Sequence, residues 1–267
     1  MINIIKYIIL GIIQGLTEPL PISSSGHIYL IKQLFKVSIN DLNFEIIVNA
    51  GSLIAIFIIY FKDIKSLIIN TINYLKTKDK LYYIDFKYSY CIAIGVLPVL
   101  IIGFLFKDII ENILTESIFI ISISFIITSI FLYLIRNKNG YKNDYNLSWK
   151  ESLFIGIIQI FALIPGISRS GSTLIAGISS NLDKETAFKY SFMLYIPISI
   201  GTTLLGIIDL IKTNNFLLLP YTLGFIFSFI VSFFTLKWFK RFVQKGKLFY
   251  FSIYCLIIGI LSLIFLL

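Results

Sequence analysis

Six long apolar runs constrain the fold of this chain more than any other feature of its sequence. They contain only two charged residues, Glu45 and Lys189, and each lies within a turn of the end of its run. A hydrocarbon core about 30 Å thick requires about 20 helical residues, so each run is long enough to cross a bilayer once. The six transmembrane helices predicted in this way cover residues 42–61, 88–106, 117–135, 186–208, 216–236 and 248–267.

The composition agrees with an all-α integral membrane protein that forms a single membrane domain over residues 1–267. Hydrophobic residues make up 57% of the chain and charged residues only 14%, which excludes a soluble domain, a disordered chain and a secreted disulfide scaffold. The net charge of +9 comes from residues between the apolar segments, so the lipid bilayer is an expected partner and nucleic acid is not. Cys91 and Cys255 lie within apolar stretches, where we expect them to be small buried side chains.

Two further apolar segments, residues 1–34 and 149–180, are interrupted near their middle by Pro, Ser and Gly. The interruptions run from Pro19 to Gly26 and from Pro165 to Gly171. Proline blocks the helical hydrogen-bond ladder, and a serine that follows it closely is a good helix N-cap. Each segment is therefore predicted to be a re-entrant helix-loop-helix, whose irregular backbone must be buried in protein or line a wet cavity.

The two interrupted segments are copies of each other. A shift of 145 residues aligns Gly11–His27 with Gly156–Ser172, and eight of the 17 aligned positions are identical. A cleaved leader, the alternative for the first segment, would have no reason to recur in mid-chain. The repeats are then residues 1–135 and 149–267, each a re-entrant segment followed by three spans. A re-entrant segment enters and leaves on the same face of the membrane, so the three spans that follow it start the second repeat on the opposite face. We therefore expect inverted-topology repeats with a functional site at their interface.

The distribution of Lys and Arg predicts the orientation in the membrane. The loops on one face of the predicted bundle carry 17 basic residues, and those on the other face carry 5. The richer face is expected to be cytoplasmic. Both termini, the loops at 35–41, 107–116 and 209–215, and the mouth of the first re-entrant segment are then outside. A multi-pass membrane protein with an outward-facing site follows from this count.

The few ionisable residues inside the apolar zone are candidates for function, because burying them is costly. Glu18, His27 and Arg169 all fall within the repeated interruptions. Gln14 and Glu18 are four residues apart and share a helix face, and Ser24 and His27 are three apart, which predicts a hydroxyl and an imidazole within reach of each other. A structural ion pair between Glu18 and Arg169 that only holds the repeats together is the alternative.

The polarity of the predicted half-helices indicates the charge of a ligand. The runs Ser23–Gly26 and Ser168–Thr173 each begin a second half-helix, so the positive ends of both helices converge at the repeat interface. Helix N-termini with serine hydroxyls and one arginine match the geometry of phosphate. We therefore expect an oxyanion to bind there, with Ser25, Gly26 and Ser170 among its contacts.

These residues resemble the motifs of the undecaprenyl-diphosphate phosphatases, the UppP/BacA family. Gln14–Glu18 is similar to the family's Glu/Gln-x-x-x-Glu motif, and Pro21–His27 to the segment that follows it. Pro165–Thr173 resembles the motif Pro-Gly-x-Ser-Arg-Ser-x-x-Thr. The resemblance extends over essentially the full length, through the shorter stretches Phe44–Gly51, Gly95–Pro98 and Tyr195–Pro197.

The resemblance implies an enzyme of the bacterial cytoplasmic (inner) membrane that hydrolyses undecaprenyl diphosphate to undecaprenyl phosphate and inorganic phosphate. Such an enzyme recycles the lipid carrier for peptidoglycan synthesis and confers bacitracin resistance. The family also implies a polyprenyl diphosphate as the lipid partner and dependence on a divalent cation, Mg²⁺ or Ca²⁺. The sequence leaves open whether the protein forms a homodimer.

By position, Glu18, Ser24, His27 and Arg169 resemble the family's catalytic set. The residues that the resemblance places around them are Gln14, Ser23, Ser168 and Thr173. Because Gln14 stands where many members have an acid, a metal chelated by two carboxylates cannot be general, and Glu18 is the best metal candidate. The expected mechanism has Ser24 attack phosphorus while Glu18 and His27 handle its proton and Arg169 holds the developing charge. His27 as the nucleophile is the competing assignment.

Two other classes of function fit the architecture. Inverted repeats with broken helices are typical of secondary transporters, so a carrier or flippase for an anionic or lipid-phosphate substrate is the alternative. The cluster of Glu18, Ser24 and His27 favours an enzyme, because a carrier needs donors around phosphate but no activated hydroxyl. A non-catalytic scaffold would leave the buried ionisable residues unexplained.

Overall fold

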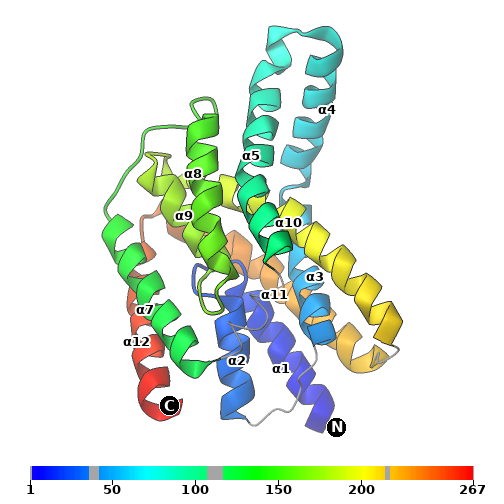
Figure 1. Ribbon diagram of the computed structural model, residues 1–267, viewed down its shortest axis with the longest axis vertical. Helices are drawn as coiled ribbons and strands as arrows, with labels where there is room; N and C mark the ends of the chain where they lie inside the picture. The colour runs from blue at the N-terminus through cyan, green and yellow to red at the C-terminus, as the bar shows by residue number, and fades with distance from the viewer. Residues whose placement is uncertain (1, 36–41, 107–116, 214–216, 267) are drawn as a thin grey trace.

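The computed structural model describes residues 2–35, 42–106, 117–213 and 217–266, and this part of the chain is helical (Figure 1). It contains no strand, only one isolated bridge between Lys142 and Leu182. The α-helices are α1 (Ile2–Thr17), α2 (Ser24–Leu34), α3 (Leu42–Ile59), α4 (Phe61–Thr77), α5 (Tyr83–Leu105), α7 (Ile118–Ile135), α8 (Trp149–Ile160), α9 (Arg169–Ser179), α10 (Lys184–Thr213), α11 (Leu218–Gln244) and α12 (Leu248–Leu266). Two short 3-10 helices, η1 (Lys80–Tyr82) and η2 (Phe161–Leu163), complete the described secondary structure.

Five helices of the described residues are long and apolar enough to cross a membrane, which confirms the predicted fold class. They are η1 with α5, α7, α10, α11 and α12. The sixth predicted span, residues 42–61, corresponds to α3. Helices α3 and α4 together are long and apolar enough for one span, but the chain bends by 70° between them. The predicted spans 117–135 and 248–267 coincide with α7 and α12. Helices α10 and α11 continue several residues past the C-terminal ends of the predicted spans 186–208 and 216–236.

The region between the first two predicted spans, residues 62–87, is expected to be a loop but is helical. Residues 62–87 form α4, η1 and the beginning of α5, which pair as a hairpin that projects from one end of the molecule (Figure 1). The charges of this region obscured its helical periodicity. The predicted loop at 209–215 is helical up to Thr213, while 36–41, 107–116 and 214–216 lie outside the described residues.

Both interrupted segments fold as a half-helix, a break and a second half-helix, as predicted. Helices α1 and α2 lie toward the end of the molecule that carries both termini, and α8 and α9 come from the opposite end (Figure 1). The breaks touch each other, because the Ser170 hydroxyl donates to the carbonyl of Leu20 at 2.9 Å. The division into inverted repeats and the re-entry of these segments from opposite sides of the bilayer stay predictions.

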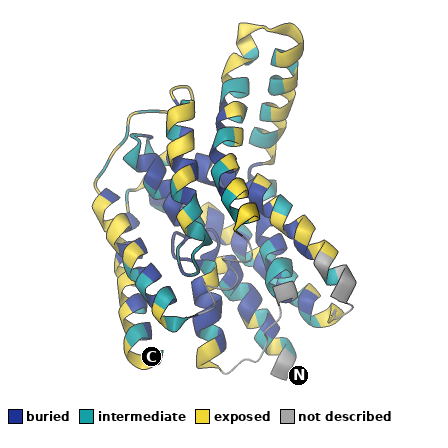
Figure 2. Cartoon of the chain, viewed as in Figure 1, coloured by how far each residue is buried: buried dark blue, intermediate teal, exposed yellow. Residues whose placement is uncertain are grey.

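The repeated glycines hold the two interrupted segments against long helices. A Cβ on Gly11 would lie 2.4 Å from the carbonyl oxygen of Gly224 in α11, and one on Gly156 would lie 2.4 Å from that of Gly95 in α5. Small residues at such crossings let helix backbones approach closely within a membrane. Buried residues face the inside of the bundle and exposed residues its outside (Figure 2), and many of the exposed residues are large hydrophobic ones. Cys91 and Cys255 are free and buried, as expected.

Candidate active site

The carboxylate of Glu18 lies at the centre of the site, one residue beyond the end of α1. Its Oε2 accepts a hydrogen bond from the side-chain amide of Gln14 at 3.1 Å and another from the hydroxyl of Ser24. The shared face predicted for Gln14 and Glu18 is therefore correct. The Glu18 side chain is only 7% exposed, and Ser24, the first residue of α2, is partly accessible. The break thus brings a serine hydroxyl directly onto a buried carboxylate.

Arg169 reaches the same carboxylate from the second break. Its Nη2 lies 3.9 Å from Oε1 of Glu18, and its Nη1 donates to the hydroxyl of Ser199 in α10 at 3.0 Å. The guanidinium also lies over the ring of Tyr195, 4.9 Å from its centroid. At 29% exposure the side chain remains accessible, and a guanidinium has five N–H donors. Arg169 can therefore hold Glu18 and still donate to an anion.

The imidazole of His27 is turned away from this cluster. Its Nδ1 lies 2.7 Å from the backbone carbonyl of Ser23, and since a carbonyl only accepts, Nδ1 donates. Its Nε2 lies 2.7 Å from the hydroxyl of Tyr254 in α12, whose ring is stacked on the imidazole. Both ring nitrogens therefore have partners other than Ser24. The expected contact between the Ser24 hydroxyl and His27 is not formed, because the carbonyl one turn back in α2 fixes the ring in another direction.

The first turn of α2 is built for tight packing. The hydroxyl of Ser23 caps the helix by accepting from the amide of Gly26 at 3.3 Å, and Ser23 adopts a left-handed φ of 66°. Such a conformation is costly for a residue with a side chain. A Cβ on Gly26 would lie 2.9 Å from the ring of Phe125 in α7. Ser25 is exposed, and its hydroxyl lies 3.3 Å from that of Ser23. Of these residues, only Ser25 presents its side chain outward.

The hydroxyls predicted to bind an anion at the second break make bonds within the protein. Ser168 caps α9 by accepting from the amide of Gly171 at 3.0 Å. Ser170 donates to the carbonyl of Leu20 in the first break. Thr173 is buried and bonds the carbonyl of Arg169 at 3.0 Å and the hydroxyl of Ser191 in α10. These bonds fasten the two breaks and hold Arg169 in place.

Several residues of the site lie outside the catalytic and binding sets expected from the sequence. The hydroxyl of Tyr195 donates to Oδ1 of Asn49 in α3 at 2.9 Å, which positions the ring beneath Arg169. Tyr195 and Asn49 fall in stretches that resemble the family, and this resemblance is the one feature of the sequence that indicates a role for them in the site. Ser199 and Tyr254 lie within apolar spans, where a single polar residue gives no indication of its partner.

The described residues contain no group of three or more His, Cys, Asp or Glu side chains that could hold a metal ion. Glu18 is the carboxylate of the site, and Gln14, Ser24 and Arg169 already surround it. A cation held mainly by protein side chains does not fit this arrangement.

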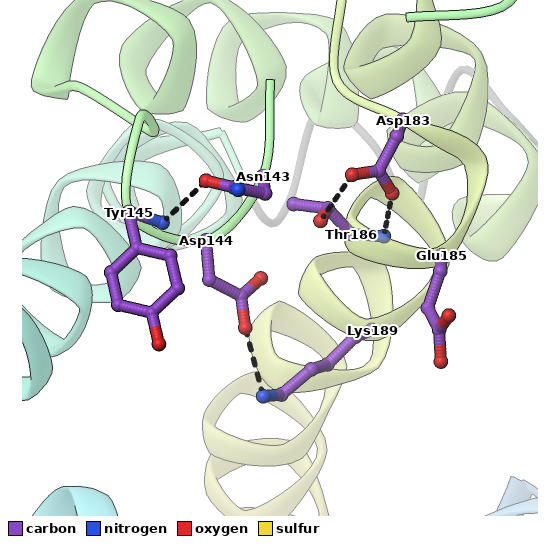
Figure 3. A pocket seen from close by; sticks show the side chains of 7 residues that line it. All are labelled: Asn143, Asp144, Tyr145, Asp183, Glu185, Thr186 and Lys189. Carbon is purple, nitrogen blue, oxygen red and sulfur yellow. Dashed lines mark hydrogen bonds and ion pairs between the residues drawn. The ribbon is translucent and has the colours of Figure 1, made fainter. Parts of the chain in front are cut away.

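A cavity of about 300 Å³ near the start of α10 is a separate, structural feature (Figure 3). Lys189, which lines it, pairs with Asp144 of the same lining at 2.9 Å and with Asp63 of α4 at 3.0 Å. Asp183 accepts from the amide of Thr186 at 2.7 Å and so caps the first turn of α10 (Figure 3). None of the predicted site residues lines this cavity, whose full lining is Asn143, Asp144, Tyr145, Asp183, Glu185, Thr186 and Lys189.

Comparisons with known proteins agree with the motifs. The family model of the bacitracin resistance protein BacA matches residues 7–261. The chain is 45% identical over 265 residues to undecaprenyl-diphosphatase 2 of Bacillus thuringiensis (strain Al Hakam), covering 98% of both chains. It is 43% identical over 264 residues to undecaprenyl-diphosphatase 1 of Bacillus licheniformis, again with 98% of both chains covered. It is also 42% identical to the undecaprenyl-diphosphatase of Oceanobacillus iheyensis, over 99% of this chain and 97% of that protein.

Proposed function

The chain belongs to the family of the bacitracin resistance protein BacA, and from this premise we infer that it hydrolyses undecaprenyl diphosphate to undecaprenyl phosphate and inorganic phosphate. It is a membrane phosphatase that regenerates the lipid carrier of cell-wall synthesis. The observation that carries the mechanism is the hydrogen bond from the Ser24 hydroxyl to the Glu18 carboxylate, with Arg169 beside it.

We propose that Ser24 is the nucleophile and Glu18 its general base. Oγ of Ser24 attacks the terminal phosphorus as its proton passes to Glu18, and the bond from that phosphorus to the bridging oxygen breaks. Undecaprenyl phosphate leaves, and the terminal phosphoryl group stays on Ser24. Glu18 gives its proton to the departing oxygen and then takes one from a water molecule that attacks the phosphoserine. Inorganic phosphate departs, and the proton returns to Oγ of Ser24.

Arg169 has the role of holding the charge that develops on the terminal phosphoryl group. Its guanidinium is oriented by Ser199 on one side and by the ring of Tyr195 below it. Such a preorganised donor stabilises the charge that develops in the transition state, and its ion pair with Glu18, at 3.9 Å, is long enough to leave donors for the phosphoryl oxygens. The N-termini of α2 and α9 add their positive ends to the same region.

We assign His27 a positioning role. As a nucleophile its Nε2 would need a free lone pair, and in the neutral ring this lone pair faces the hydroxyl of Tyr254. Through Nδ1 the imidazole instead fixes the carbonyl of Ser23, the residue that precedes the nucleophile. His27 therefore holds the first turn of α2 in the orientation that presents Ser24 to Glu18.

A divalent cation, Mg²⁺ or Ca²⁺, enters this proposal only as a companion of the substrate. The described residues offer Glu18 but no set of ligands around it, so the cation would be bound mainly by diphosphate oxygens. The proton and phosphoryl transfers described above use side chains of the protein alone. All of these side chains belong to one chain, so the proposal requires no second copy of the protein.

We further propose that the substrate reaches the site from the outer leaflet of the cytoplasmic membrane, with both termini outside. The unequal count of Lys and Arg on the two faces supports this orientation. Single cysteines test it. A cysteine at Lys36 should react with an impermeant reagent from outside, and one at Lys78 should not. The reverse result would overturn the orientation, and labelling of both cysteines from the same side would overturn the inverted-repeat argument.

Phosphate release from undecaprenyl diphosphate by the purified protein in detergent tests the function. The wild type should release one phosphate per lipid, and the Ser24→Ala variant should release almost none while remaining folded. A transporter would give the opposite pattern: no phosphate release, but movement of a labelled lipid phosphate across liposomes. That result would replace the enzyme by a carrier.

A further inference from the structure

Ser23, the residue before the proposed nucleophile, has a backbone conformation that residues with side chains rarely adopt. Its φ is 66° and its ψ is 103°. Among the described residues, the other non-glycine positions with a positive φ are Lys78 and Asn181, and both follow the end of a helix, where such a φ is common. Ser23 instead precedes a helix. A strained residue of this kind persists only where its surroundings enforce it.

The counterpart of Ser23 in the second break caps its helix without this strain. Ser168 has a φ of −73° and a ψ of 122°, and its hydroxyl accepts from the amide of Gly171 at 3.0 Å. The hydroxyl of Ser23 accepts from the amide of Gly26 at 3.3 Å. Capping therefore does not require a left-handed residue, and another requirement of the first break must account for it.

That requirement is the position of Ser24. Its hydroxyl donates to the carboxylate of Glu18 directly after the strained residue. The aligned residue of the second break is Arg169, whose long side chain reaches Glu18 from a relaxed backbone. A serine side chain has no such reach, so the backbone before it must turn to bring its hydroxyl to the carboxylate. The strain thus serves the contact on which the proposed mechanism depends.

The carbonyl of Ser23 is held by the residue four positions on. The backbone amide of His27 donates to this carbonyl at 3.3 Å, and ring Nδ1 of His27 donates to it at 2.7 Å. In the second break, the amide of Ser172 closes the equivalent turn on the carbonyl of Ser168 at 2.8 Å. The imidazole therefore adds a short hydrogen bond where the backbone bond is long, and this bond holds the strained residue in place.

The hydroxyl of Tyr254 in α12 supports this bond from the other side of the imidazole ring. Because Nδ1 of His27 carries the proton, Nε2 of the neutral ring carries a lone pair. The Tyr254 hydroxyl lies 2.7 Å from Nε2 and donates to that lone pair. His27 is only 9% exposed, so loss of the hydroxyl would leave the lone pair buried without a partner. Tyr254 therefore favours the tautomer and the ring orientation that hold Ser23.

The imidazole of His27 lies between aromatic side chains of two helices that are bonded to each other. The ring of Tyr254 is stacked on it, with centroids 5.6 Å apart, and the ring of Phe125 in α7 meets it edge-on at 5.0 Å. The hydroxyl of Ser252 in α12 donates to the carbonyl of Ser129 in α7 at 2.9 Å. Because α7 and α12 are joined in this way, Tyr254 and Phe125 form a fixed frame around the imidazole.

We propose that Tyr254 is a positioning residue of the phosphatase site. Its hydroxyl holds the imidazole of His27, and the imidazole holds the strained backbone of Ser23. That backbone in turn presents Ser24 to Glu18. The inference rests on the proposed function, because it takes Ser24 as the group that attacks phosphorus. Without the tyrosine hydroxyl, Ser23 relaxes toward an ordinary extended conformation, and the nucleophile moves away from its base.

Tyr254→Phe tests the proposal, because it keeps the stacked ring and removes only the hydroxyl. In phosphate release from undecaprenyl diphosphate, kcat should fall about tenfold and KM should change little, since the nucleophile is displaced while the binding groups remain. The matched control is Tyr190→Phe, which removes a buried tyrosine bond of the same 2.7 Å length, to the carbonyl of Cys91. Its kcat should equal that of the wild type. Equal losses of kcat in the two variants would overturn the proposal.

Glycine at position 23 provides a test by rescue. Glycine adopts a positive φ without steric cost and weakens a helix cap only slightly, so its backbone needs less support. In a Ser23→Gly background, Tyr254→Phe should therefore reduce kcat by about twofold instead of tenfold. In a Ser23→Ala background, which also lacks the hydroxyl but keeps the Cβ, the tenfold loss should remain. A tenfold loss in both backgrounds would show that Tyr254 does not support a strained residue.

The nitrogen NMR spectrum of the imidazole tests the hold on Ser23 without any turnover. His27 is the one histidine of the chain, so histidine labelled with ¹⁵N gives one pair of ring signals. The wild type should show a protonated Nδ1 and a hydrogen-bonded, unprotonated Nε2. Tyr254→Phe should shift the Nε2 signal, and Tyr190→Phe should not.

Two results of this spectrum would overturn the proposal: a wild-type ring with its proton on Nε2, or an Nε2 signal that Tyr254→Phe leaves unchanged. The spectrum also separates this inference from the function on which it rests. A wild type that gave the expected signals but released no phosphate would overturn the phosphatase function, and with it the catalytic purpose of the contact, but not the hold of Tyr254 on His27.

Discussion

The two interrupted segments have the same backbone plan and different chemistry. Aligned with the offset of 145 residues, Gly11 and Gly156 make equivalent close contacts with a glycine of a long helix. Ser23 and Ser168 each cap the second half-helix by accepting from the glycine three residues on. Packing and capping are therefore shared by both segments.

The side chains at the centre of the breaks are where the segments diverge. Glu18 of the first segment aligns with Leu163 of the second, and Ser24 aligns with Arg169. The first segment thus supplies an acid and a hydroxyl, and the second supplies a cation to the same place. Sequence identity within the repeat indicates what builds the scaffold, and the differences within it indicate what performs the chemistry.

The glutamines show the consequence of this divergence most directly. Gln14 donates to Glu18, whereas neither amide atom of its counterpart Gln159 has a hydrogen-bond partner among the described residues, although the side chain is only 1% exposed. The reason is that the position four residues after Gln159 is Leu163. The second segment has kept the amide and lacks the acid that would satisfy it.

The largest expected effect is the difference in turnover number between variants of Ser24 and Ser170. Ser24→Ala should reduce the turnover number roughly a thousandfold or more, because the nucleophile is lost. Ser170→Ala, in the second segment, removes a hydrogen bond to Leu20 but no reacting atom, so it should leave the turnover within about a factor of three. Initial rates of phosphate release measure both. Equal losses in the two variants would show that both serines are structural or that both react.

Arg169→Lys tests whether the second segment supplies chemistry or only an ion pair. An ammonium cannot reproduce the planar fork of donors, so kcat/KM should fall about a hundredfold. The thermal unfolding temperature in detergent should change little, because the ion pair to Glu18 at 3.9 Å is long and the lysine keeps the charge. Retained activity together with lost stability would instead favour a structural clasp between the segments.

The shared scaffold predicts matched losses of stability. Gly11→Ala and Gly156→Ala each place a methyl group against a backbone oxygen, and each should lower the free energy of unfolding by about 2 kcal/mol. Denaturation in detergent, followed by tryptophan fluorescence or circular dichroism, compares the two. A loss confined to one variant would mean that the equivalence of the segments does not extend to their energetics.

The smallest effect concerns the glutamines. Gln159→Leu removes two unsatisfied polar atoms at similar volume and should raise the free energy of unfolding by about 1 kcal/mol without changing activity. Gln14→Leu should lower activity about tenfold, because it removes a donor that orients Glu18. Destabilisation by Gln159→Leu would show that a water molecule or another ligand satisfies this amide in the folded protein.

Much of the architecture could be predicted from local sequence. The helices, the two breaks and their capping serines follow from runs of apolar residues and from proline, whose effects extend over a few residues only. The hairpin of α4 is the exception: its lysines favour a loop, although Phe61, Ile68, Ile72 and Leu75 have helical spacing. The helical period was present in the sequence but was outweighed by the charge count.

The sequence by itself determined which residues are exceptional in this membrane protein: a few ionisable side chains at two repeated breaks, with a cation in one break and an acid in the other. The tertiary structure decided which of them meet. His27 pairs with Tyr254, 227 residues away, and turns from Ser24, while Ser199 and Tyr195 orient Arg169. Spacing along a helix gives the direction of a side chain to within a face, but a hydrogen bond is lost when its atoms move by an ångström or two. Only the packing of one helix on another sets positions to that precision.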